Sequence, residues 1–348
     1  MPRLRRIDCS APGITRRRRG RGFEYLDERG QRVTEPAVLD RIKELAIPPA
    51  WRDVWICTHR MGHIQATGTD DAGRKQYRYH DAWRERRDRE KFESMVEFAR
   101  ALPDLRRRVE RDLSADGIGR ERVLACAARL LDRGFFRIGS EDYADENGTY
   151  GLATMHKRHV TIDGGLVLFD YRSKGGSRRV QALEDPQLAE LVRVLKRRRG
   201  GGEELLAFKR GGRWVDVKSA DINDYVREAT GGDFTAKDFR TWNATVLAAV
   251  ALAVSATARG RSRTARKRAI TRAIKETARY LGNTPAVCRA SYIDPRVFDR
   301  FEGGLTIGGV LPELAGDASS WPAVQGTIEE AVLDLIEREH SPALEKVA

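Results

Sequence analysis

Five residues between positions 137 and 292 could together cleave a phosphodiester bond. They are two arginines, a lysine, an amide and a late tyrosine: Arg137, Lys174, Arg240, Asn283 and Tyr292. Guanidinium groups bind the non-bridging oxygens of a phosphate bidentately, and an ammonium can protonate a departing sugar oxygen. A phenol can act as the nucleophile, so this set predicts an exchange of phosphodiester for phosphotyrosine.

Each of these residues also has an ordinary structural interpretation. Arg137 follows a predicted helix end and could be a surface cation, while Lys174 lies among further arginines in what could be a solvated hairpin. Arg240 occurs in an otherwise apolar helix, where a buried arginine requires a partner and a structural salt bridge would supply one. Tyr292 could be a core aromatic. Only the order and spacing of the whole set favour catalysis.

Further motifs occur in order along the chain: Ile47–Trp51, Gly62–Gly68, Gly73–His80, Glu146–Thr154 and Lys237–Thr241. With the five residues above, they resemble the type IB DNA topoisomerases of the small bacterial and poxviral kind, over about residues 23–305. The resemblance selects Lys174 from its neighbouring cations. One departure is Asn283, because the family often places a histidine there, so a neutral amide replaces an imidazole.

The resemblance implies a DNA topoisomerase that relaxes supercoils by transient single-strand cleavage. Tyr292 would expel the 5′-hydroxyl and hold the 3′-end of the DNA as a phosphotyrosyl diester. That bond keeps much of the original bond energy, so resealing would need neither ATP nor a metal. Only about one tyrosine in a thousand is ionised at pH 7, so nearby guanidiniums would have to lower the pKa of the phenol.

The resemblance also implies DNA contacts by Gln76, Tyr77, Tyr79, Tyr143 and Lys237. Tyr77 and Tyr79 alternate along a strand and would share one face, although either could belong to a half-buried aromatic strand. A dense run of basic residues precedes the Tyr292 segment, and it predicts either a face that tracks DNA phosphates or a plain solvated helix. Its members are Arg259, Arg261, Arg263, Arg266, Lys267, Arg268 and Arg272.

The net charge of +13 independently favours a polyanionic partner. We expect double-stranded DNA, clamped by a monomer. A membrane partner is not expected, because the longest apolar run, Ala244–Val254, is about half of the roughly 20 residues that span a bilayer. The four cysteines have no close pairing, which predicts a reduced, cytoplasmic protein. With DNA as its partner, we expect the protein to be nucleoid-associated.

No cofactor is expected. The segment Val217-Lys218-Ser219 lacks the glycine that a phosphate-binding loop needs before its lysine, so no nucleotide site is predicted. His59 and His63 lie in strand-like sequence, where positions four apart do not converge, and no metal site is predicted.

The sequence predicts an α+β fold, with a small antiparallel β-rich domain before a larger, mainly α-helical catalytic domain. The expected divisions are a mobile basic arm at 1–22, a β-rich DNA-binding domain at 23–82, a catalytic domain at 83–310, and a linker and helix without assigned role at 311–348. Expected strands are Phe23–Leu26, Val54–Cys57, His63–Thr67, Gln76–Tyr79 and the hairpin His159–Phe169. Expected helices are Glu35–Leu45, Asp81–Leu102, Arg120–Asp132, Asp185–Arg198, Ala220–Glu228, Thr235–Ala256, Ser262–Leu281 and Ile328–Glu339.

Two alternatives remain open at this point. Leu281-Gly282-Asn283 resembles a motif of the tyrosine recombinases, which use the same covalent chemistry. However, Lys237 stands where their His-x-x-Arg box has its histidine, and a β-rich first domain replaces the usual helical one. A non-enzymatic DNA-binding protein would explain the charge, but not the ordered set of five.

Overall fold

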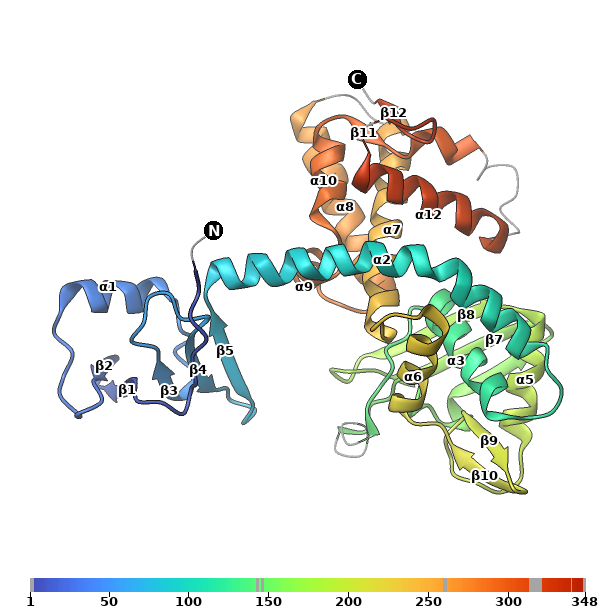
Figure 1. Cartoon of the computed structure of the whole chain (residues 1–348), viewed down its shortest axis with the longest axis horizontal. Helices are drawn as coiled ribbons and strands as arrows, with labels where there is room; N and C mark the ends of the chain where they lie inside the picture. Colours follow the sequence, from blue (N-terminus) through green and yellow to red (C-terminus); the bar gives the residue numbers. More distant parts are fainter. Residues whose placement is uncertain are drawn as a thin grey trace. The chain divides into compact units, whose positions relative to one another are not determined.

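The computed structural model describes residues 3–141, 144, 147–258, 262–312, 321–338 and 340–346. The chain divides into two compact units, Met1–Phe92 and Glu93–Ala348 (Figure 1). The division falls inside helix α2 (Asp81–Leu113), later than the boundary expected at residues 82–83. The predicted α+β class is confirmed, because an antiparallel sheet precedes a mainly helical part.

The first unit is built on a five-stranded antiparallel sheet in the order β2-β1-β3-β4-β5. Its strands are β1 (Ile14–Arg19), β2 (Gly22–Leu26), β3 (Arg52–Ile56), β4 (Ile64–Thr69) and β5 (Lys75–Tyr79). Helix α1 (Pro36–Glu44) contributes Ile42 to a small core with Ile14, Val54, Ile56 and Ala66.

The expectation of an unfolded arm over residues 1–22 is wrong for residues 14–19, which form strand β1. Ile14 is buried in the core, and Gly20, at φ 57°, makes the tight turn into β2. Arg16 lies 4.2 Å above the ring of Phe23 and donates to the carbonyl of Trp51 at 2.6 Å. These contacts give Arg16 the partners that solvent would otherwise supply.

The second unit is mainly helical (Figure 1). Beyond α2 its helices are α3 (Arg120–Gly134), α5 (Pro186–Arg197), α6 (Ser219–Thr230), α7 (Ala236–Ala258), α8 (Arg263–Leu281), α9 (Pro285–Ser291), α10 (Pro295–Glu302) and α12 (Trp321–Glu337), with short turns η1 (Lys157–His159) and η2 (Gly308–Val310). The terminal helix predicted at Ile328–Glu339 therefore begins earlier.

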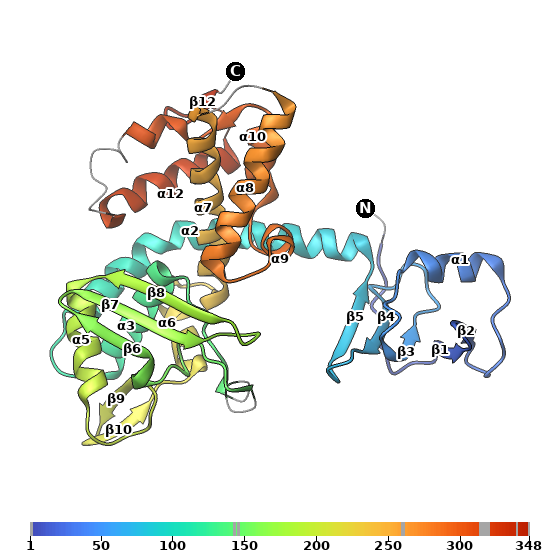
Figure 2. The same cartoon turned by 180° about the vertical axis from the view of Figure 1, so that it is seen from behind.

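A three-stranded sheet and two small two-stranded sheets accompany these helices. The sheet has the order β6-β7-β8, with β6 (Val160–Asp163), β7 (Leu166–Arg172) and β8 (Arg178–Glu184), and α5 packs on β6 and β7 (Figure 2). The hairpin is β9 (Ala207–Arg210) with β10 (Arg213–Asp216). The second two-stranded sheet pairs β11 (Leu305–Thr306) with β12 (Glu345–Lys346), which follows α12 in the chain. The hairpin predicted at His159–Phe169 is confirmed, whereas β8 and the two small sheets were not predicted.

Helix α7 is the central helix of the second unit, packing against α3, α6, α8, α10 and α12. It carries the buried side chains Phe239, Trp242 and Leu252. By length and composition alone, its segment Ala236–Ala256 is long and apolar enough to cross a membrane, but 67% of an 18-residue stretch of it is buried within the structure. The expectation that no segment reaches that length is therefore corrected, and the burial is that of a core helix.

Candidate active site

Arg240 lies at the centre of the candidate site. It projects from α7, is only 4% exposed, and donates to the carbonyl of Phe135 at 2.7 Å and to that of Leu281 at 2.9 Å. It therefore ties the ends of α3 and α8 to α7. Both acceptors are neutral, and no carboxylate in the described part of the chain forms an ion pair with it, so the salt-bridge interpretation does not hold. Its Nε is buried without a hydrogen-bond partner.

Tyr292 lies against this guanidinium, with its ring centroid 5.2 Å from Cζ of Arg240. It ends α9, where its N–H donates to the carbonyl of Cys288 at 3.0 Å, and its own carbonyl accepts from Thr245 of α7 at 3.4 Å. The next residue, Ile293, is fully buried. The half-buried tyrosine is thus held through its backbone by both α9 and α7.

The pKa of Tyr292 is lowered from its ordinary value. Burial alone would raise the pKa, but the charge of Arg240 and a contact with it act in the opposite direction. The charge of Arg137 and a contact with Asn283 add to this effect, and together they outweigh burial. The site therefore raises the fraction of phenolate, the nucleophilic form, above that of a free tyrosine.

Asn283 and Arg137 meet beside the tyrosine. Helix α8 ends at Gly282, whose φ of 64° turns the chain so that Arg137 Nη2 reaches the Gly282 carbonyl at 2.8 Å and Asn283 Oδ1. Because Oδ1 accepts from Arg137, the amide nitrogen must face the other way as a donor. Nδ2 is buried and makes no hydrogen bond of normal geometry, although Asn283 lies near enough to the phenol to help lower its pKa.

The backbone that carries Arg137 is fixed by the Gly148–Thr154 segment. Phe135 ends α3 with a φ of 54°, an uncommon conformation for a residue with a side chain. The carbonyl of Arg137 then accepts from Leu152 at 2.8 Å. A Cβ at Gly151 would lie 2.4 Å from the Cα of Gly139, so two chain segments approach closely here.

Lys174 is exposed in the turn between β7 and β8. The turn is closed by Ser173 donating to the Ser177 carbonyl at 2.8 Å, with Gly175 and Gly176 at positive φ. Arg179, on β8, donates to the carbonyls of Arg279 at 3.1 Å and Tyr280 at 2.6 Å, at the end of α8. The base of the turn is therefore fastened to the helix that leads to Asn283.

Arg179 is one of the arginines around Lys174 to which the sequence assigned no role of their own. Its position on β8 places it next to Gly282, where a Cβ would lie 2.7 Å from the Arg179 guanidinium. Tyr171 was also missed. Burial raises its pKa, against the charges of Arg179, Arg240 and Arg137, so this buried phenol lies next to the arginines of the site. Tyr171 continues the period of two that Val167 and Phe169 begin along β7, all three being buried, and this strand periodicity was the available signal.

The predicted DNA contacts are distributed over both units. In the first unit, the rings of Tyr77 and Tyr79 are stacked at 5.9 Å, which confirms that they share a face, and Tyr77 is 43% exposed. Gln76 donates to Asp70 at 2.9 Å, so its side chain is engaged within the strand region. In the second unit, Lys237 is exposed in the first turn of α7.

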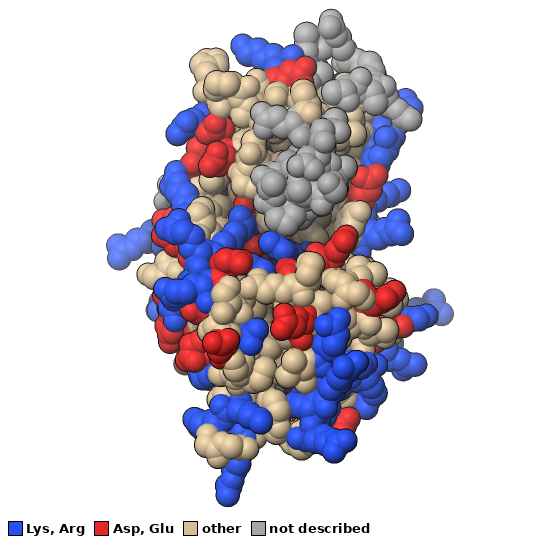
Figure 3. Space-filling model, turned by 90° about the vertical axis from the view of Figure 1, so that its right-hand side faces the viewer, with Lys and Arg blue, Asp and Glu red and all other residues tan. Residues whose placement is uncertain are grey.

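Three predicted positions lie outside the described residues: Tyr143, Arg259 and Arg261. Lysine and arginine side chains cover much of the face in Figure 3, with carboxylates interspersed. Among the described residues, no group of three or more His, Cys, Asp or Glu is arranged to hold a metal ion.

Comparison with known families accounts for both parts of the chain. Residues 80–302 match the model for the eukaryotic DNA topoisomerase I catalytic core, and residues 22–70 match that for the bacterial DNA topoisomerase IB N-terminal domain. The second match favours a topoisomerase over a tyrosine recombinase, because it concerns the β-rich part that distinguishes the two.

Similarity to individual proteins agrees. The chain is 32% identical to DNA topoisomerase 1B of Acanthamoeba polyphaga mimivirus over 295 residues, which cover 81% of this chain and 85% of the viral protein. It is 32% identical to DNA topoisomerase 1 of Candidozyma auris over 163 residues, 45% of this chain and 20% of that protein. It is 26% identical to DNA topoisomerase 1 of Daucus carota over 160 residues, 45% of this chain and 19% of that protein. The chain belongs to the type IB DNA topoisomerases.

Proposed function

We propose that this topoisomerase relaxes supercoiled DNA through a 3′-phosphotyrosyl intermediate formed by Tyr292. The observation that carries the proposal is the packing of Tyr292 against Arg240, with Arg137 and Asn283 beside it and a lowered phenol pKa. The phenolate attacks phosphorus, the Tyr292 oxygen–phosphorus bond forms, and the bond to the 5′-oxygen breaks. That oxygen leaves as a hydroxyl once it receives a proton.

Buried donors in the site match the oxygens of the reacting phosphate. Arg137, Arg240 and the Asn283 amide would stabilise the charge that builds on the non-bridging oxygens, and each such contact is typically worth about 10² to 10³ in rate. Arg240 Nε and Asn283 Nδ2 are buried donors without good partners in the protein, so a phosphate would satisfy them.

Lys174 is the proposed general acid for the leaving oxygen. Its ammonium is carried on an exposed turn whose base is fastened to the end of α8 by Arg179. A cation on such a turn can approach the leaving group while the guanidiniums hold the phosphate.

We further propose that the enzyme acts as a monomer on double-stranded DNA in the nucleoid of the cytoplasm, without ATP or a metal. The reverse attack by the 5′-hydroxyl restores the original bond, and the duplex rotates between the two steps. Relaxation of plasmid of either supercoil sign should proceed in excess chelator without nucleotide. A strict requirement for Mg²⁺ or ATP would contradict this part of the proposal.

The covalent step is tested with Tyr292→Phe, which keeps the ring against Arg240 and removes only the nucleophile. The wild-type protein, denatured during the reaction, should carry a DNA strand that resists denaturant, whereas the variant should carry none. The variant should still bind duplex DNA normally. A denaturant-resistant adduct in Tyr292→Phe would place the nucleophile elsewhere.

A further inference from the structure

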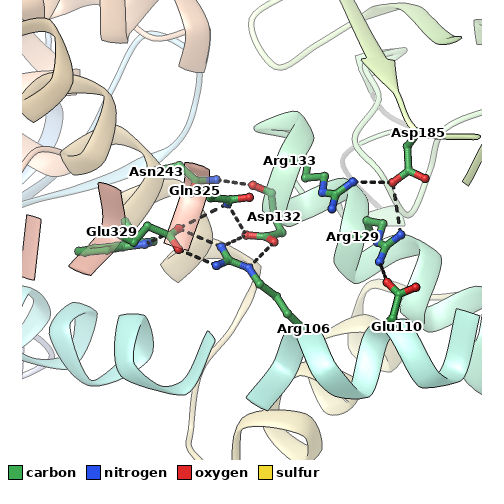
Figure 4. Close-up of polar contacts among 10 residues, drawn as sticks. Arg106, Glu110, Arg129, Asp132, Arg133, Asp185, Asn243, Gln325 and Glu329 are labelled. Carbon is green, nitrogen blue, oxygen red and sulfur yellow. Dashed lines mark hydrogen bonds and ion pairs between the residues drawn. The ribbon is translucent and has the colours of Figure 1, made fainter. Parts of the chain in front are cut away.

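A buried polar network joins the C-terminal helix α12 to α2 and α3 (Figure 4). Arg106 of α2 donates to both oxygens of Asp132, in the last turn of α3, at 2.8 and 2.9 Å. The same guanidinium donates to both oxygens of Glu329 of α12, at 2.5 and 2.9 Å. Each pair is therefore bidentate. Both carboxylate residues are only 7% exposed, so their charges are largely shielded from water.

The network continues into α7, which carries Arg240. Trp242 Nε1 donates to Glu329 at 3.1 Å, and Asn243 Nδ2 donates to the main-chain carbonyl of Asp132 at 2.9 Å. These two residues lie two and three positions after Arg240 in α7, and Asp132 lies three positions before Phe135, whose carbonyl accepts from Arg240. The bonds therefore form a closed circuit through α12, α2, α3 and α7.

We propose that Glu329 is a positioning residue for the catalytic arginines, so that α12 is part of the catalytic apparatus. This proposal rests on the roles given above to Arg137, Arg240 and Tyr292. Glu329 touches none of the reacting atoms. It holds the end of α3 and the second turn of α7 in one register, which aligns the Phe135 carbonyl with Arg240 and directs Arg137 to Asn283.

Docking of α12 alone does not require this network. The helix also buries an apolar face, with Ile328, Val332 and Leu335 at most 2% exposed. Replacing a buried ion network by apolar side chains often leaves the stability of the fold unchanged or increases it. Such a network is therefore weak evidence for a stabilising role, and it fits better with a role in fixing one geometry. The register it fixes is that of the two segments that present Arg137 and Arg240.

The decisive variant is Glu329→Gln, which keeps the shape of the side chain and an acceptor for Trp242 but removes the charge facing Arg106. The matched control is Glu337→Gln on the same helix. Glu337 also pairs with an arginine of α2, Arg100, at 2.6 Å, but this pair is more exposed and the contacts described for Glu337 do not reach α3 or α7.

Single-turnover cleavage is measured at saturating DNA, on a strand that cannot be resealed, together with the Kd, the Tm and the dependence of the rate on pH. Glu329→Gln should slow cleavage about tenfold or more, because small displacements of catalytic groups cost up to about 10² in rate. Its Kd should stay within about twofold, since the DNA-binding surface is unchanged.

The rising limb of the pH profile of Glu329→Gln should move to higher pH, because Arg240 and Arg137 would lower the pKa of Tyr292 less. Glu337→Gln should match the wild type in all of these.

A Glu329→Gln protein with normal cleavage and a normal pH profile would overturn the proposal, whatever its Tm. If that variant fails to fold, Asn243→Ala cuts the link between α7 and α3 without touching α12, and the same slower rate and shifted profile are expected. A normal cleavage rate and pH profile in Asn243→Ala would equally overturn the proposal.

The outcome with Tyr292→Phe separates the two proposals. An adduct in that variant would refute the chemistry itself, whereas an inactive Tyr292→Phe beside a normal Glu329→Gln would refute the positioning role alone.

Discussion

At the scale of the residue, the site depends on positive charge placed against a phenol. The pKa of Tyr292 is lowered because Arg240 and Arg137 outweigh the effect of burial. The reaction needs the phenolate, so the cleavage rate should rise with pH until it passes the pKa of the folded enzyme. A lower pKa places this rise at lower pH, and removal of a guanidinium must move it upward.

Arg137→Gln should therefore have two effects on single-turnover cleavage measured between about pH 6 and 10. The rate at pH 7 should fall by about 10² to 10³, from the lost contact to the transition state, and the rising limb should shift to higher pH. Arg289→Gln serves as the control, because Arg289 lies on α9 against Phe298 and is not among the charges that shift Tyr292. A lower plateau with an unchanged limb would mean that Arg137 does not influence the phenol.

The roles of Lys174 and Asn283 can be separated by the leaving group. An alkoxide needs a proton to leave, whereas a 5′-thiolate does not, so Lys174→Ala should cleave an ordinary strand very slowly yet recover most of its rate on a 5′-bridging phosphorothiolate. Asn283→Ala should show no such recovery, because its amide acts at a non-bridging oxygen. Asn283→His should keep substantial activity, since an imidazole can make the same hydrogen bond. Equal recovery in both alanine variants would contradict the division, and none in Lys174→Ala would move the acid elsewhere, with Lys237 next.

At the scale of the element, the loop after α3 places Arg137 through its close contact with the Gly148–Thr154 segment. Gly151→Ala would put a Cβ 2.4 Å from the Cα of Gly139 and 2.8 Å from the Arg137 carbonyl, both of which are backbone atoms. The backbone of Arg137 must then shift, and a fall of about 10² in the cleavage rate is expected, with little change in Kd. Gly119→Ala is the control, since its Cβ would meet no atom within 4 Å. Normal cleavage by Gly151→Ala would show that the segment only supports Arg137 loosely.

The long, periodic elements were predictable from sequence, and the tertiary ones were not. Helices α5, α7 and α8 appear near their predicted bounds, because apolar spacing and capping residues mark them. Helix α9 was missed although it begins with a capping threonine and Pro285, since it has only 7 residues and little periodicity. Strand β1 was missed because Arg16 depends on Phe23 and on carbonyls distant in sequence.

The candidate site shows the same division. The order of motifs identified Arg137, Arg240, Asn283 and Tyr292, and the structure brings these four together. The Arg106–Glu329 contact joins residues 223 positions apart, and neither residue lies in a recognisable motif. A pattern along one chain cannot indicate such a pair, because only the packing of α12 creates it.

At the scale of the whole molecule, the excess of positive charge is modest compared with the number of charged groups. The chain has 64 Lys and Arg against 51 Asp and Glu, and many cations are used in ion pairs, such as Arg106 with Asp132 and Arg178 with Asp170. The number of phosphates that the protein neutralises must therefore be far below its number of cations. Exposed cations that gather on one helix face are the better candidates, and α8 offers Lys267, Arg268, Arg272 and Lys275.

Salt dependence counts these contacts directly. Each neutralised phosphate releases condensed counterions, so log Kd should rise against log salt with a slope of about 0.9 per contact, and the wild-type slope should be steep. Lys267→Gln and Arg272→Gln should each reduce the slope by about 0.9 while leaving the cleavage rate at saturating DNA unchanged, because neither side chain lies in the catalytic cluster.

Arg107→Gln on α2 is the control, since Arg107 is also exposed but already pairs with Asp104. Filter binding between about 50 and 200 mM salt suffices, because 6–10 phosphate contacts would change the affinity by about 10³ to 10⁵ over that range. An unchanged slope in both α8 variants would show that this helix face is solvated rather than bound to DNA, and a flat wild-type profile would mean that the basic faces do not touch DNA at all.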